Sequence, residues 1–146
     1  MSIEENKALV HHFLSEGVNA HDLGAIGSLL APEFVAHVAG VPRPLDRESY
    51  MGFLAAAIAA FPDLEEQVEE MVADGDKVAV RGTSRGTHRN EFQGMAPTGN
   101  RIEVGWTDIF RVSMGKIVGN HARLDYYSLQ TQLAAKSAPT AAPSTT

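Results

Sequence analysis

The chain has 146 residues, 44% of them hydrophobic, so it can bury one core but is too short to divide comfortably into two domains. Its formal charge of -6, with Lys and Arg scattered singly, excludes the basic surface that nucleic-acid binding requires. The absence of cysteine excludes disulfides, thiolate catalysis and cysteine-based zinc sites, so any chemistry must use histidines, carboxylates, hydroxyls or arginines.

The N-terminal half carries mostly helical patterns. Residues 3–18 place their apolar side chains along one stripe, which predicts an amphipathic helix. Asp22 is the expected N-cap of a short second helix, and Asp46 that of a third helix with a broad apolar face. Residues 34–39 between them are β-like, and residues 40–44 are rich in turn formers. We therefore expect three helices and one short strand before residue 64.

The C-terminal half changes to strand-like alternation. Asp74-Gly75-Asp76 is a tight hairpin signal, and Met114-Gly115 predicts a second hairpin turn. The expected strands cover residues 64–73, 77–88, 101–113 and 116–126, followed by a short helix over 127–134. Residues 135–146 are nearly all Ala, Pro, Ser and Thr, which predicts a flexible tail. The expected organisation is a single domain over residues 1–134.

Several short motifs share one order and spacing with a known family. They are Phe61-Pro62-Asp63, Gly86-Thr87-His88, Glu91-Phe92-Gln93-Gly94, Pro97-Thr98-Gly99, Asp108-Ile109-Phe110-Arg111 and Gly115-Lys116-Ile117-Val118. With the order of elements, they make the chain resemble the SnoaL-like polyketide cyclases of the nuclear-transport-factor-2-like superfamily. The resemblance implies a cone-shaped α+β barrel, in which N-terminal helices pack on a curved antiparallel β-sheet around a cavity.

One position departs from the family pattern. After Gly-Lys-Ile-Val, members often continue with a Glu-His-Trp-Asp-like segment whose acidic residue is the expected acid/base. Here the chain runs from Gly119 to Asp125, and Ala122 occupies the position of that carboxylate. The resemblance therefore implies cyclase or isomerase chemistry in general, but the family's acid cannot be carried over to this chain.

Strand geometry suggests a different pair. If Met114-Gly115 is a two-residue loop, the antiparallel register places Asp108 opposite His121, Trp106 opposite Arg123, and Val104 opposite Asp125. Alternation then puts these residues, with Phe110, on one face that suits a lined cavity. The other face, with Thr107, Ile109, Val118, Asn120, Ala122 and Leu124, suits a surface covered by a second subunit, so we expect a homodimer.

The predicted dyad is His121 with Asp108, in which Asp108 would orient the imidazole for general acid/base catalysis. Trp106, Phe110, Arg123 and Asp125 are the accompanying substrate-binding candidates, and His37 and Tyr50 are candidates from other elements. Each has a structural alternative: His121 and Asp108 as a cross-strand pair, and Arg123 and Asp125 as an ion pair at the sheet end. No spacing predicts a metal site, and we expect no cofactor.

Three functions stay open. The first is a cofactor-independent cyclase or isomerase that moves a proton next to a carbonyl of a small hydrophobic or polyketide-like compound. The second is a non-catalytic protein whose cavity binds a small hydrophobic molecule. The third is epoxide hydrolysis of the limonene-epoxide-hydrolase type, with Asp108, Arg123 and Asp125 around one water. No apolar run approaches the roughly 20 residues of a membrane span, and the N-terminus is acidic, so we expect a cytoplasmic protein without a membrane partner.

Overall fold

The helices begin where the sequence places capping residues. The structure is a computed structural model, and it describes residues 2–136. Asp22 and Asp46 cap the second and third helices as predicted, because their side chains accept hydrogen bonds from the backbone of Ala25 (3.0 Å) and Ser49 (2.8 Å). The helical elements are α1 (Ile3–His12), a π-helical segment η1 (Phe13–Val18), α2 (Leu23–Leu29), α3 (Arg47–Ala60) and α4 (Tyr126–Ala134).

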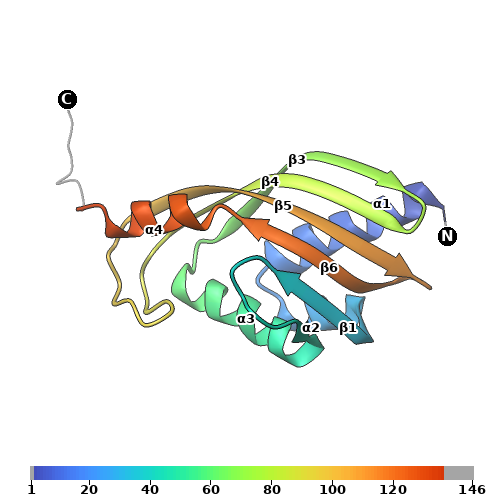
Figure 1. Cartoon of the computed structure of the whole chain (residues 1–146), viewed down its shortest axis with the longest axis horizontal. Coiled ribbons are helices and arrows are strands. Elements are labelled where there is room, and N and C mark those ends of the chain that lie inside the picture. The colour runs from blue at the N-terminus through green and yellow to red at the C-terminus, as the bar shows by residue number, and fades with distance from the viewer. Residues whose placement is uncertain (1, 137–146) are drawn as a thin grey trace.

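The strands form one curved, open sheet (Figure 1). They are β1 (Leu30–Val38), β2 (Leu45–Asp46), β3 (Glu65–Asp74), β4 (Lys77–Thr87), β5 (Arg101–Ser113) and β6 (Lys116–Leu124). Their spatial order is β2-β1-β6-β5-β4-β3, and every neighbouring pair is antiparallel except β1 and β6, which run parallel. The predicted α+β cone is confirmed, with the refinement that its sheet is mixed and not closed.

The helices enclose the concave side of this sheet. α1 packs against β3 and β4, α3 against β1, and α4 against β5 (Figure 1). The main core lies between helices and sheet and includes Val10, Phe13, Ile26, Phe34 and Phe110, all almost fully buried. The remaining apolar residues between α3 and β5 line a cavity rather than fill it.

Several element boundaries differ from the prediction. The α-helical pattern of the first helix ends at His12, and its last six residues wind as a π-helix. The first strand begins at Leu30 instead of residue 34, because residues 30 and 35–38 pair with β6. The predicted flexible tail lies mostly outside the described residues. Within residues 2–136, no helix has the length and apolar character that crossing a membrane would need.

Candidate functional site

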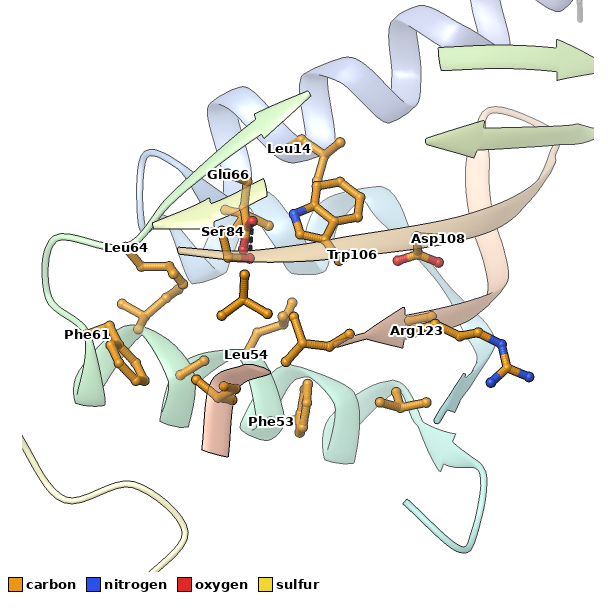
Figure 2. Close-up of a pocket in the computed structure, with 18 of the residues that line it drawn as sticks. Leu14, Phe53, Leu54, Phe61, Leu64, Glu66, Ser84, Trp106, Asp108 and Arg123 are labelled. Carbon is orange, nitrogen blue, oxygen red and sulfur yellow. Dashed lines mark hydrogen bonds between the residues drawn. The ribbon is translucent and has the colours of Figure 1, made fainter. Parts of the chain in front are cut away.

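An apolar cavity lies between α3, η1 and the inner face of the sheet (Figure 2). Its volume is about 160 Å³, close to the roughly 150 Å³ of an engineered apolar cavity that accommodates benzene. Aromatic and aliphatic side chains form most of its wall, and the polar groups are few. Five predicted site residues line this cavity: Tyr50, Trp106, Asp108, Phe110 and, at its rim, Arg123.

Asp108 is a buried acid in the wall of the cavity. The residue is 7% exposed, and its Oδ2 accepts a hydrogen bond from Asn120 Nδ2 at 3.0 Å. Among the described residues, its Oδ1 has no hydrogen-bond partner. Burial raises the pKa of Asp108 to about 8, and the hydrogen bonds from Asn120 and the backbone offset only part of that effect. Near neutral pH this carboxyl therefore exists in both its protonated and its ionised form.

Tyr50 lies near Asp108 in the wall of the same cavity. The residue is 5% exposed, and burial raises the pKa of its hydroxyl strongly, with a further contribution from the negative charge of Asp108. A tyrosine in this condition stays protonated and can donate a hydrogen bond. One wall of the apolar cavity thus carries an acid with an available oxygen, Asp108, which Asn120 holds by a hydrogen bond. The same wall carries a neutral hydrogen-bond donor, Tyr50.

The predicted pairing of Asp108 with His121 is wrong. Asp108 lies opposite Ala122, and His121 lies opposite Ile109, because β6 carries a β-bulge at Val118, between the pairs Arg111–Gly119 and Val112–Ile117. The extra residue shifts the register by one, and a shift of one exchanges the two faces of a strand. Ala122 and Leu124 therefore line the cavity, whereas both were expected on the outer face.

The two histidine candidates lie together on the outer face of the sheet. His37 and His121 are cross-strand neighbours in the parallel pair of β1 and β6, and both are exposed. Their rings stack with centroids 4.4 Å apart and an interplanar angle of 8°. Neither lines the cavity, so the geometric argument for His121 as the acid/base and for His37 as a substrate contact is lost.

Arg123 and Asp125 do not form the predicted group with Asp108. Arg123 lies opposite Thr107, not Trp106, and its guanidinium extends away from the apolar side chains at the rim of the cavity (Figure 2). Asp125 lies beyond the end of β6 and caps α4, accepting hydrogen bonds from Ser128 N (3.1 Å) and Oγ (2.9 Å). An Asp-Arg-Asp arrangement around one water, as epoxide hydrolysis would need, is therefore absent from the described residues.

Sequence reasoning missed three polar residues of this site, Asn120, Glu66 and Ser84. Asn120 was assigned to the outer face by the same register error. Glu66 was not considered, although Leu64, Glu66 and Val68 alternate along one strand and the two apolar members indicate an inward face. This alternation of apolar residues on either side of Glu66 is the sequence signal that points to Glu66 as a cavity residue. No cluster of three or more metal-ligating side chains occurs within residues 2–136.

Comparison with known proteins agrees with this architecture. The sequence model of the SnoaL-like polyketide cyclase family matches residues 8–133. IdmH from Streptomyces antibioticus, a candidate polyketide cyclase, is 33% identical with a TM-score of 0.79, covering 89% of this chain and 99% of IdmH. AclR from Streptomyces galilaeus, a candidate hydroxylase, is 29% identical with a TM-score of 0.83, covering 90% of this chain and 97% of AclR.

A third structure supports the fold alone. A candidate SnoaL-like polyketide cyclase from Jannaschia sp. CCS1 is 23% identical with a TM-score of 0.86, covering 94% of this chain and 97% of that protein. The comparison with curated proteins found no match. The family match covers most of the chain and the solved structures share its whole architecture. This chain therefore belongs to the SnoaL-like polyketide cyclase family.

Proposed function

We propose that this protein catalyses cofactor-independent proton transfer next to a carbonyl group of a small hydrophobic molecule bound in the cavity. This step is shared by aldol-type ring closure and by isomerisation. The observation that carries the proposal is Asp108, a buried carboxyl in an apolar wall with one oxygen unpartnered among the described residues and a pKa raised to about 8. A general acid or base works best when its pKa lies near the working pH.

In the proposed reaction, ionised Asp108 takes a proton from the carbon next to the carbonyl through Oδ1. The enolate that forms is stabilised by a neutral donor, for which Tyr50 is available because burial keeps its hydroxyl protonated. The proton then returns from Asp108 to carbon or oxygen of the product. Asn120 holds the other carboxyl oxygen and keeps the acid oriented.

Ala122 gives this proposal a further physical basis. It occupies the position where the family resemblance places an acid, and it is the direct cross-strand partner of Asp108. Directly opposite residues of an antiparallel pair have their Cβ atoms about 4.5–5.5 Å apart. We infer that Asp108 supplies from β5 the acid that β6 lacks.

Isotope exchange tests the proposal directly. The protein would be incubated in D2O with a panel of planar aromatic ketones that includes 1-tetralone and 2-tetralone, and deuterium at the carbon beside the carbonyl would be followed by mass spectrometry. We expect catalysed exchange to rise with pH and level off above about 8, the pKa of Asp108. Asp108→Asn should lower the rate at least ~10²-fold.

The matched control is His121→Asn, because His121 lies on the outer face and should leave exchange unchanged. Equal rates in the wild type and in Asp108→Asn would contradict the proposal. Binding of the ketones without any exchange would instead favour the second candidate, a non-catalytic binding protein. The nearly complete apolar lining of the cavity is the observation that supports this second candidate.

A further inference from the structure

A second carboxyl, Glu66, lies in the wall of the same cavity and acts as a hydrogen-bond acceptor. Glu66 and Ser84 are direct partners across β3 and β4, and Ser84 Oγ donates a hydrogen bond to Glu66 Oε1 at 2.5 Å. The indole nitrogen of Trp106 lies on the side of these two residues (Figure 2). Among the described residues, Glu66 Oε2 has no hydrogen-bond partner. One oxygen of this carboxyl is therefore available to a ligand.

The backbone of Glu66 is fixed from the helical side. The side chain of Asn19, directly after η1, donates to Glu66 O at 2.9 Å and accepts from Glu66 N at 2.6 Å. These two hydrogen bonds hold the edge of β3 against the helices. They place the Glu66 side chain on the cavity wall, where packing alone would favour an apolar residue.

The carboxyls of this cavity have no positive partner. Among the described residues, neither Glu66 nor Asp108 forms an ion pair, and Asp108 Oδ1 is buried without a hydrogen-bond partner. The only basic side chain in the described wall is Arg123, whose guanidinium extends away from the apolar side chains (Figure 2). Burial without a counter-charge raises the pKa of both acids. The polar groups that face this space thus lack a donor that carries a positive charge.

The rest of the wall suits a cation that is attached to an apolar body. Aromatic rings of Phe53, Phe61 and Trp106 line the cavity, and the faces of such rings attract cations. The fold already bears the cost of removing the Glu66 carboxyl from water. A ligand therefore has to desolvate only its own charged group in order to form the ion pair.

We propose that the free oxygen of Glu66 binds a positively charged amine of the ligand. The donors of Ser84 and Trp106 favour the ionised form of Glu66, which is the form that pairs with an ammonium group. Through Ser84, Glu66 is in register with Val104 on β5. Asp108 lies four residues farther along that strand, so the amine and the reacting carbon lie at separate points of the cavity. The ligand is thus a hydrophobic ketone that carries a basic amine.

This inference rests on the proposed function, because it assigns the ligand class of the same cavity. Three matched ligands test it by isothermal titration calorimetry at neutral pH. The compound 6-aminomethyl-1-tetralone carries the ammonium group, 6-ethyl-1-tetralone replaces that group by a methyl group, and 6-hydroxymethyl-1-tetralone carries a neutral donor. The wild type should bind the aminomethyl compound at least about tenfold more tightly than the ethyl compound, as expected for a hydrogen bond to a charged group.

Two variants of Glu66 and one of its neighbour separate charge from shape. Glu66→Gln removes the charge with little change of shape and should bring the aminomethyl-to-ethyl affinity ratio close to one, while unchanged affinity for the ethyl compound shows that the cavity is intact. Glu66→Asp keeps a carboxyl and should retain part of the ratio. Glu65→Gln is the matched control, because it removes the same charge from an exposed neighbour on β3 and should leave the ratio unchanged.

Three results overturn the proposal. The first is a wild type that binds the aminomethyl compound no more tightly than the ethyl compound. The second is equal affinity for the hydroxymethyl and aminomethyl compounds, which would show that a donor suffices without a positive charge. The third is a ratio that persists in Glu66→Gln and is lost in Asp108→Asn, which would place the amine at Asp108 instead.

This proposal and the catalytic proposal fail in different ways. If exchange in 1-tetralone depends on Asp108 but the aminomethyl preference does not depend on Glu66, only the amine site is wrong. If the preference follows Glu66 but no ketone exchanges its protons, only the catalytic proposal is wrong. If none of the three ketones binds the wild type, both are overturned.

Discussion

Carboxyl side chains have opposite environments on the two faces of the sheet. On the inner face, the carboxyls of Glu66 and Asp108 lie in an apolar cavity, and burial raises the pKa of each. Elsewhere on the same strands, exposed carboxylates pair with arginines, as Glu69 and Glu70 do with Arg81 at 3.0 and 3.2 Å. The difference teaches that position in the alternation, not residue type, decides which acids of this protein are buried with a raised pKa.

Neighbouring residues on β5 provide the strongest test of this contrast. Phe110 is 1% exposed and contacts Phe13 edge to face, with centroids 5.7 Å apart, whereas Ile109 is 43% exposed. Phe110→Ala should lower the free energy of unfolding by about 3–5 kcal/mol, and Ile109→Ala by about 0.5 kcal/mol. Urea unfolding of both variants checks this. Similar losses would mean that another surface covers Ile109 in solution, as the still untested homodimer prediction requires.

Asp108 should make the stability of the protein fall as the pH rises. Its pKa is about 8 when folded and near the model-compound value of 3.8 when unfolded, so the native state binds more protons between about pH 4 and 8. Stability therefore decreases through that window and levels off above it. Asp108→Asn removes this titration. As the pH rises from 5 to 7, the wild type should lose about 2–3 kcal/mol of unfolding free energy that the variant keeps. Thermal melts at several pH values measure the difference, and parallel curves would contradict the burial argument.

Gly82→Ala should destabilise the inner face of the sheet, because it displaces the indole ring of Trp106. The added methyl group would lie 2.5 Å from both the indole and the backbone oxygen of Gln67, so the ring or the strand must move. Overpacking of this kind costs about 1–3 kcal/mol. We expect a lower thermal midpoint together with a shifted Trp106 emission maximum. Gly105→Ala is the control, because a Cβ at Gly105 meets nothing within 4 Å, and it should leave the emission unchanged.

Arg81→Ala should have the smallest effect of the series. The arginine side chain is 56% exposed, and its ion pairs with Glu69 and Glu70 are on the surface. Surface pairs of this kind contribute about 0–1 kcal/mol, and salt screens them. Urea unfolding at low and high ionic strength checks this. A loss as large as that of Phe110→Ala would show that exposed charges stabilise the sheet as strongly as the core does.

The sequence predicted the fold well because capping residues and hairpin signals are local. Asp22 and Asp46 mark the starts of their helices, and Asp74-Gly75-Asp76 marks the turn between β3 and β4. The inner face of β5 was also predicted correctly, since strict alternation runs uninterrupted from Val104 to Phe110. Each of these features depends on a few adjacent residues and on no distant contact.

The candidate site was predicted only in part, because it depends on register between strands. The turn at Met114-Gly115 is where the sequence placed it, and Ser113 does face Lys116. The bulge at Val118 follows directly, in a run of apolar and small residues that has no feature marking an extra residue. His121 was therefore assigned to the wrong face, and Arg123 lies opposite Thr107 and reaches only the rim of the cavity, whereas Asp108, on the regular strand, was placed correctly.

The bulge at Val118 also determines which residues of β6 form the cavity wall. The single extra residue at the bulge in β6 decides that Ala122 and Leu124 face the cavity, while His121 lies on the outer face and Arg123 reaches only the rim. The π-helical segment Phe13–Val18 is a second irregularity of the same size, since each such turn accommodates one additional residue in a helix. Deleting Val118 would therefore exchange the set of β6 residues that faces the cavity in one step, because a shift of one residue exchanges the two faces of a strand. Point substitutions would reach the same rearrangement only through many separate steps.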